Sequence, residues 1–329
     1  MQANFNQLKK WIGELPEDML EQYPILQIYF LYTSLYSGLP ADDAFGQLNR
    51  IEAMDSTGQL SGEIMAQKAL ISAFGNDIQR SADLIMKALE ILPEERTFFR
   101  STISGYLGLA YMLNGETAAA KVTLEESASV SEKAGNLTTQ IIALSHLAEI
   151  AFLEGRVGAA EDLAHQMVDR CLDEKGAKRP ISGLAYIILG VAQRERGKYS
   201  EAIQTLNLGV DLVERVMPLA AIRGYVNLAW LHHLLGEDNS VDLAIDTAIK
   251  TAVQFEQMED DDIYVLQNHA KLVIARGKPL LALEMLGLDL ENLPLAMDRL
   301  ANIDISNNLK KPSDLIQYII TAEALLALD

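Results

Sequence analysis

A glycine that ends a helix-like apolar segment returns at a nearly constant spacing along this chain. The glycines are Gly38, Gly75, Gly115, Gly155, Gly197, Gly236 and Gly277, with successive separations of 37, 40, 40, 42, 39 and 41 residues. Glycine closes a helix readily, because without a Cβ atom it enters the left-handed conformation at no steric cost. A repeating period of this kind indicates units that each pack against their neighbours. We therefore expect each glycine to lie in the turn of a helical hairpin.

Small residues at fixed offsets from these glycines predict close contact between the two helices of each hairpin. Seven residues before five of the glycines stand Gly108, Ala148, Gly190, Ala229 and Ala270. Five residues after the glycine stand Asp43, Arg80, Ala120, Ala160, Ala202, Val241 and Ala282, from the first repeat to the seventh. Apolar residues recur at spacings of three and four, which indicates helices and not strands. The sequence predicts an all-α fold.

The charge and the cysteine content exclude several classes of protein. The net charge of −19 disfavours a nucleic-acid surface, because binding to phosphates requires clustered Lys and Arg. The single cysteine, Cys171, allows no disulfide within the chain and suits a reducing compartment. The sequence contains neither the apolar core of a signal peptide nor an apolar run of about 18 residues that would span a membrane. We expect a cytoplasmic protein with no direct contact to nucleic acid or membrane.

Motifs for common catalytic chemistry are missing from the sequence. It has no Walker A loop to hold phosphates, no dinucleotide-binding G-x-G-x-x-G and no G-x-S-x-G nucleophile elbow. Its five histidines lack the paired spacing of metal ligands. We expect no catalytic residue, no cofactor and no metal site. The acidic run from Glu259 to Asp262 is interpreted as the N-terminus of a helix, where carboxylates are favoured.

The segment LGVAQRERGKYSEAI, Leu189 to Ile203, resembles a tetratricopeptide repeat, with its small residue, turn glycine and following alanine. The period of about 40 exceeds the usual 34 or so, which predicts longer helices. The resemblance implies tandem hairpins that form a right-handed superhelix, with the first helix of each hairpin on the inner face. About seven hairpins, with an opening helix near residues 6–15 and a closing helix near 312–328, then account for a single domain of residues 1–329.

Inner positions follow from the turn glycine, at 13, 10, 6 and 3 residues before it. In the first two repeats these positions are apolar or small, whereas polar and aromatic residues gather in repeats four to seven. Aromatic area combined with a few hydrogen-bonding groups suits a small polar ligand or a peptide. The candidate ligand-binding residues, taken from these positions together with Asn227, are Glu149, Arg194, Arg223, Asn227, Trp230, His233, Tyr264, Gln267 and Lys271. Trp230 is the expected platform, and Arg194, Arg223 and Lys271 are expected to meet an anionic group.

The opening segment QLKKWIGELPEDMLEQYPILQIYFLYTSLYSG is similar to the first sensor repeat of MalT-type regulators, the large ATP-dependent members of the LuxR family. The resemblance implies an inducer-binding region of a transcriptional activator. It further implies an ATPase module before the region and a DNA-binding module after it, so that we expect this chain to be a fragment of a longer regulator. None of the family's ligand residues can be placed on this sequence by motif, and the inducer and the oligomeric state stay open.

The alternative function is a protein-interaction scaffold that binds a peptide or a partner protein. Lys271, Arg223 and Asn227 would then hold a C-terminal carboxylate. Both hypotheses predict a binding protein without catalysis. They differ in whether the ligand is a small molecule or a peptide.

Overall fold

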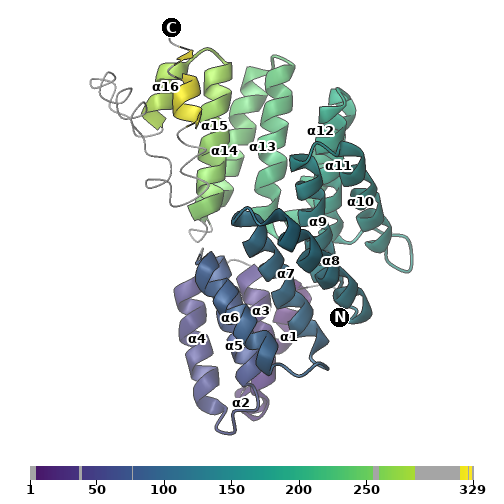
Figure 1. The fold of residues 1–329 in the computed structure, drawn as a ribbon, viewed down its shortest axis with the longest axis vertical. Coiled ribbons are helices and arrows are strands. Elements are labelled where there is room, and N and C mark those ends of the chain that lie inside the picture. Colours follow the sequence, from purple (N-terminus) through teal and green to yellow (C-terminus); the bar gives the residue numbers. More distant parts are fainter. Residues whose placement is uncertain are drawn as a thin grey trace. The chain divides into compact units, whose positions relative to one another are not determined.

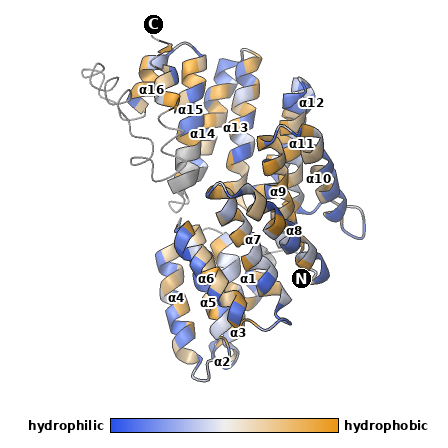
Figure 2. Cartoon of the chain, in the orientation of Figure 1, coloured by the Kyte–Doolittle hydropathy of each residue, from blue (hydrophilic) through white to orange (hydrophobic). Residues whose placement is uncertain are grey.

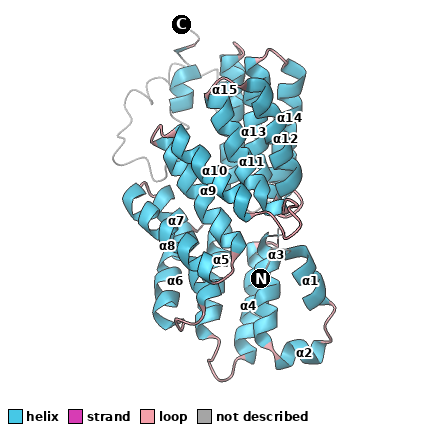
Figure 3. Ribbon diagram, turned by 90° about the vertical axis from the view of Figure 1, so that its right-hand side faces the viewer, coloured by secondary structure: helices cyan, strands magenta, loops and turns pink. Residues whose placement is uncertain are grey.

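The structure, a computed structural model, describes residues 5–36, 39–75, 77–254, 259–285, 319–324 and 326–327. In these ranges the regular elements are helices, and β pairing is limited to an isolated bridge between Leu172 and Lys178 (Figure 3). The predicted all-α repeat fold is therefore confirmed. None of the described helices combines the length and apolar character that a membrane span requires.

Helices α1 (Phe5–Gly13) and α2 (Glu17–Gln22) precede a series of helical hairpins (Figure 1). The first helices of the hairpins, here called A helices, are α3 (Pro24–Tyr36), α5 (Ser61–Phe74), α7 (Thr97–Leu113), α9 (Leu137–Leu153), α11 (Gly183–Glu195), α13 (Pro218–Leu234) and α15 (Glu259–Ala275). The second helices, here called B helices, are α4 (Ala41–Met54), α6 (Ile78–Ile91), α8 (Thr117–Lys133), α10 (Val157–Arg170), α12 (Tyr199–Val213), α14 (Asp238–Gln254) and α16 (Pro279–Met285). A short 3-10 helix, η1 (Pro180–Ser182), leads into α11.

The predicted opening helix is thus present as α1. Of the closing helix predicted over 312–328, residues 319–324 are helical, and residues 312–318 lie outside the described ranges. The acidic run predicted to begin a helix does so at Glu259, the first residue of α15, although its side chains are not described.

The chain divides into two compact units, and the boundary falls inside α13, between Gly224 and Tyr225. The first unit contains the described helices from α1 to α12 with the first turns of α13. The second contains the remainder of α13 with α14, α15 and α16. That residues 1–329 act as a single domain stays a prediction.

Five turn glycines, from Gly115 to Gly277 in the repeat series, have positive φ angles between 71° and 78°. In each of these turns the next residue donates its backbone N–H to a carbonyl five residues earlier, as Glu116 does to Tyr111 at 2.8 Å. This is the hydrogen bond of a Schellman motif, which satisfies carbonyls at the end of the A helix. Gly38 lies outside the described residues.

In the first two hairpins, the alanine position predicted by counting from the turn glycine is wrong by one residue. In the second hairpin the same hydrogen bond runs from Asp77 to Ser72, at 2.8 Å, one residue later relative to Gly75 than in the five turns above, and Gly75 has a φ of −85°. Ser81, and not Arg80, therefore occupies the alanine position, where its hydroxyl donates to the Ala69 carbonyl at 2.9 Å.

In the first hairpin the turn holds one additional residue. Ala44 N–H donates to the Pro40 carbonyl at 2.8 Å and Ala44 is fully buried, whereas Asp43 is exposed. Ala44, and not Asp43, therefore takes the alanine position. The two predictions were wrong for different reasons: in the second hairpin the turn lies one residue later than Gly75 indicates, and in the first the turn itself is longer by one residue.

Glycines at the predicted close contacts are required by their surroundings. A Cβ atom on Gly108 would lie 2.6 Å from Leu124 Cγ, and one on Gly190 would lie 2.5 Å from Leu206 Cγ. Ala148, Ala229 and Ala270 at the same place in other hairpins are fully buried. The A and B helices of each hairpin therefore pack with little side chain between them, as predicted.

Hydropathy differs between the two kinds of helix. In Figure 2 the A helices α9 and α11 carry mostly hydrophobic colour, whereas the B helices α4 and α10 carry more hydrophilic colour. An A helix contacts both flanking hairpins, as α9 does with α8, α10, α7 and α11, and so buries more than one face. The candidate ligand-binding residues named from the sequence lie on the A helices of the fourth to seventh hairpins, α9, α11, α13 and α15.

Ion pairs join consecutive hairpins at one recurring place. The residue directly before a turn glycine meets the residue six positions after the preceding turn glycine. The pairs are Glu154 with Lys121, Arg196 with Glu161 at 2.6 Å, and Arg276 with Asp242 at 2.5 Å. The sign of the charge on the turn is negative in the first pair and positive in the other two.

Candidate ligand-binding site

In the first unit, two of the predicted residues pair with each other. The guanidinium of Arg223, on α13, donates to the carboxylate of Glu149, on α9, although 74 residues separate them in sequence. The second oxygen of Glu149 lies 3.2 Å from Nδ1 of His146, one turn earlier on α9. The predicted role of Arg223 toward an external anion is therefore in competition with an internal carboxylate.

His146 completes this cluster, and the sequence argument did not select it. Burial, followed by the positive charge of Arg223, lowers the pKa of His146 to about 3. The imidazole is therefore neutral near pH 7 and acts as a hydrogen-bonding group beside Glu149. A neutral histidine held against a carboxylate fixes the position of that carboxylate.

Arg194, at the end of α11, is the third predicted residue in the first unit. Its guanidinium binds the neighbouring Glu195, with Nη2 at 2.5 Å from Oε1, and its side chain is largely covered. An anionic ligand at this position would also have to compete with a carboxylate.

In the second unit, the predicted platform Trp230 is held by a residue on the next A helix. The indole Nε1–H donates to Oδ1 of Asn268, on α15, at 3.2 Å. The imidazole of His233 packs edge-on to the indole ring, with 6.1 Å between ring centroids and an interplanar angle of 78°. Trp230 and His233 are both half-buried. The indole therefore has a fixed orientation and retains accessible surface.

Three further predicted residues lie on the same two helices. Asn227 on α13 and Gln267 on α15 are buried, at 8% and 7% exposure, and Lys271 on α15 is half-buried. Lys271 is not among the described residues that form ion pairs with one another. The backbone of Tyr264 belongs to α15, but its side chain lies outside what the structure describes.

Asn268 and His146 were missed because they stand one residue outside the positions that were counted. Both lie nine residues before a turn glycine, as does Asn227. A count that included this position would have found them. The same position in the second hairpin, after correction of its register, is the fully buried Gln67.

The corrected register also changes the inner positions of the second hairpin, which the sequence described as apolar or small. The first of them is Glu63, whose side chain is 2% exposed and whose carboxylate lies 2.8 Å from Nε of Arg96. A carboxylate buried in this way needs its partner, because an isolated charge away from water is strongly disfavoured. The ion pair between Arg96 and Glu63 links the N-terminal end of α7 to α5.

Taken together, the hairpins with polar and aromatic side chains on their A helices define a tetratricopeptide region that binds a ligand or a partner. The sequence model of the MalT-like TPR region matches residues 62–292, well over half of the chain. The chain therefore belongs to the family of MalT-like TPR regions. A search of curated proteins found no significant match.

Solved structures share this fold at low sequence identity. The Rap protein complexed with Competence and Sporulation Factor is 14% identical, with a TM-score of 0.60 over 99% of this chain and 90% of its own. NprR in complex with its cognate peptide NprX is 13% identical, with a TM-score of 0.61 over 98% of this chain and 95% of its own. The Cut9–Hcn1 hetero-tetramer of the APC/C is 14% identical, with a TM-score of 0.61 over 98% of this chain and 53% of its own. At these identities the likeness concerns the fold alone.

Proposed function

We propose that this chain is the inducer-sensing region of a MalT-like, LuxR-family transcriptional activator, which binds a small effector on the A helices of its sixth and seventh hairpins. Membership of the MalT-like TPR family supports the architecture. The proposal places the region in the cytoplasm, within a regulator that also carries an ATPase module and a DNA-binding module. No catalytic role is included.

The observation that carries the proposal is the fixed indole of Trp230 among hydrogen-bonding side chains. An aromatic face supplies contact area, and nearby amides, an imidazole and an ammonium supply orientation and specificity. The donor and acceptor groups are Asn227, His233, Gln267, Asn268 and Lys271. The carboxamides offer both donors and acceptors, which suits a neutral polar ligand such as a sugar.

In the first unit, Glu149 and Arg223 neutralise each other, so we do not assign them direct contact with the effector. We propose instead that their ion pair holds α9 and the start of α13 in a fixed arrangement. Arg194 is paired with the adjacent Glu195 on its own helix, and we do not assign it contact with the effector either. The predicted anion-binding function then rests on Lys271.

The chain has two tryptophans, and this permits a direct test. Trp11, on α1, is 58% exposed and can be replaced by Phe, which leaves Trp230 as the single tryptophan. We expect one class of small molecule in a panel of sugars, amino acids and short peptides to raise the melting temperature and to change the fluorescence of Trp230. Binding to the native state alone stabilises by about 2.7 kcal/mol at a ligand concentration of roughly 100 times Kd.

Trp230→Ala should abolish the shift, whereas Trp11→Phe should leave it intact. A shift produced by peptides and by no small molecule would favour the alternative function, a scaffold for a peptide or a partner protein. NprR, a protein of this fold, was solved with a peptide. A small-molecule shift that survives Trp230→Ala would contradict the placement of the site.

A further inference from the structure

Gln67, on α5, carries a buried amide that no described protein group satisfies. Its side chain is fully buried, yet neither Nε2 nor Oε1 has a hydrogen-bond partner among the described residues. Buried polar groups are nearly always hydrogen-bonded, because a group that has left water without finding a new partner destabilises the folded state. The Gln67 amide therefore requires partners beyond the protein groups around it.

Another buried amide of the first unit shows the usual arrangement. Nδ2 of Asn136 donates to Thr139 Oγ1 at 2.9 Å and to Thr102 Oγ1 at 3.1 Å, and its Oδ1 accepts from the backbone N–H of Thr139 at 3.4 Å. Hydroxyl groups placed beside Asn136 thus satisfy its amide on both sides. The chain places no such group within hydrogen-bond reach of Gln67 in the parts that the structure describes.

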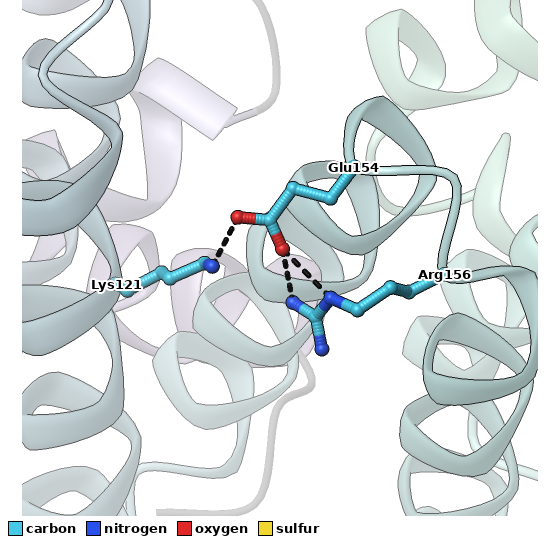
Figure 4. Close-up of polar contacts among 3 residues, drawn as sticks. All are labelled: Lys121, Glu154 and Arg156. Atoms are coloured by element: carbon cyan, nitrogen blue, oxygen red, sulfur yellow. Dashed lines mark hydrogen bonds and ion pairs between the residues drawn. The ribbon is translucent and has the colours of Figure 1, made fainter.

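Glu63, one turn before this amide on α5, has an oxygen in the same condition. Its Oε1 lies 2.8 Å from Nε of Arg96, but the contact lacks the alignment of a hydrogen bond, and no other described group bonds to Oε1. The carboxylate of Glu154 differs, since Figure 4 shows Lys121 bound to one of its oxygens and Arg156 to the other. The Glu63 side chain is only 2% exposed, so bulk water does not supply the missing bond.

The unsatisfied groups lie close together. Glu63 and Gln67 are four residues apart on α5, and side chains at this spacing share one face of a helix, with about 5–6 Å between their Cβ atoms. Tyr29, on α3, lies beside the same carboxylate: burial raises the pKa of Tyr29, the charge of Arg96 lowers it, and the charge of Glu63 raises it. The face of α5 that carries both side chains is thus turned toward α3 and the start of α7.

Water is the chemical species that fits this set of groups. Gln67 needs an acceptor for Nε2–H and a donor for Oε1, and Glu63 needs a donor for its own Oε1. A cation would serve the two oxygens and leave Nε2–H unpaired, and an anion would be repelled by the carboxylate. A water molecule both donates and accepts, and internal waters typically form about three hydrogen bonds to buried groups of this kind.

We propose that Glu63 and Gln67 form a binding site for ordered internal water, which accepts from Nε2 of Gln67 and donates to Oε1 of Glu63. The bridge connects the Glu63–Arg96 ion pair to the middle of α5. The polar inner positions of the second hairpin then serve the packing of α3, α5 and α7. This site is independent of the α13 and α15 residues proposed to bind the effector.

The first experiment is a crystal structure of the full chain at about 1.5 Å resolution, together with that of Gln67→Met. In the wild type we expect a water oxygen about 2.7–3.2 Å from both Gln67 Nε2 and Glu63 Oε1. Methionine has nearly the size of glutamine but no amide, so this water should be lost in the variant. The proposal is overturned if protein groups alone satisfy the amide, or if the water remains in Gln67→Met.

Thermal unfolding gives a readout in solution. If water satisfies the amide, Gln67→Met leaves Glu63 Oε1 unpaired and should lower Tm by about 2–4 °C. If the amide had no partner, its removal would raise Tm, because an apolar side chain suits an apolar surrounding better. Gln204→Met, at an exposed position of α12, is the matched control and should shift Tm by less than about 1 °C. A Tm for Gln67→Met equal to or above that of the wild type overturns the proposal.

Discussion

The A helices of the first three hairpins and those of the sixth and seventh use their aromatic residues differently. In α3, α5 and α7 the aromatic rings contact each other in a continuous series, with ring centroids 5.1–5.9 Å apart. Tyr32, Tyr36 and Phe99 in this series are buried. In α13, Trp230 contacts the single imidazole of His233 and a side-chain amide of the next helix.

The difference fits a single repeat architecture that serves stability in one region and, in our proposal, recognition in the other. Aromatic rings packed edge to face contribute about 0.5–1.5 kcal/mol for each pair beyond their buried area. In the first three hairpins the aromatic rings pack against each other, so little aromatic surface is exposed to a ligand. The later hairpins leave an aromatic face partly exposed beside amide, imidazole and ammonium side chains, which is the expected arrangement at a binding site.

The largest expected effect tests whether the early aromatic series is structural. Phe99→Ala removes a ring that is 2% exposed and should lower the free energy of unfolding by about 3–5 kcal/mol. Trp230→Ala, at a half-buried position, should lower it by less than half as much. Urea denaturation followed by circular dichroism measures both. Equal losses would remove the distinction between the two regions.

An intermediate effect concerns pH and His146, in the fourth hairpin. Its folded pKa of about 3 lies below the ordinary value of 6.5, so the neutral form is favoured on folding. The resulting stability is present above pH 6.5 and is lost as the pH falls toward 3. Between pH 6.5 and 5 the loss should be about 1–2 kcal/mol.

His146→Gln, which cannot titrate, is the matched control for this pH dependence. The pH dependence of the melting temperature should be shallower in the variant over that interval. Glu149 and Arg223 are the charged groups next to the ring, and Arg223→Gln should raise the pKa of His146 toward 6.5 and so reduce the stability that is lost as the pH falls. A wild-type curve that is flat from pH 6.5 to 5 would show that the ring is not held neutral.

The smallest effect separates aromatic packing from hydrogen bonding in the early series. The hydroxyls of Tyr106 and Tyr36 are 3.0 Å apart, and Tyr36→Phe removes that hydrogen bond while it keeps the ring. We expect a loss of about 1 kcal/mol at pH 7. A loss as large as that of Phe99→Ala would mean that polar contacts, and not ring packing, hold these hairpins together.

Tyr36→Phe has a second readout at alkaline pH. Burial raises the pKa of Tyr36 well above 10, so the native state resists ionisation and its stability falls as the pH rises past 10. The variant should lose less stability than the wild type over that range.

The fold was predictable because the packing of helical hairpins requires glycines and small residues at regular intervals along the sequence. Turn glycines and small residues at fixed offsets located all seven hairpins that the described residues contain. The pattern failed at Ala44, where the turn is longer by one residue, and at Ser81, where the turn lies one residue later than Gly75 indicates. A shifted reference residue moves every position that is counted from it in either direction, and Glu63 was overlooked for this reason.

The candidate site was less predictable, because partners in space are far apart in sequence. Trp230 and His233 are one turn apart, and periodicity places them together. Asn268, which orients the indole, comes from another hairpin, and Glu149 pairs with Arg223 across 74 residues. Residue spacing within a hairpin carries no information about such contacts. Cys171 is fully buried, and burial raises the pKa of its thiol to about 12, so the thiol stays protonated at neutral pH.

The ion pairs at the turns have a consequence for how this array can change in length. The fourth hairpin presents Glu154 to Lys121 of the hairpin before it and Glu161 to Arg196 of the hairpin after it. Excision of this hairpin by recombination would bring Lys121 against Arg196, two like charges. Hairpin four therefore joins two neighbours whose facing charges have the same sign, and its loss would replace two attractive contacts by one repulsive contact unless one of the two cations were also substituted.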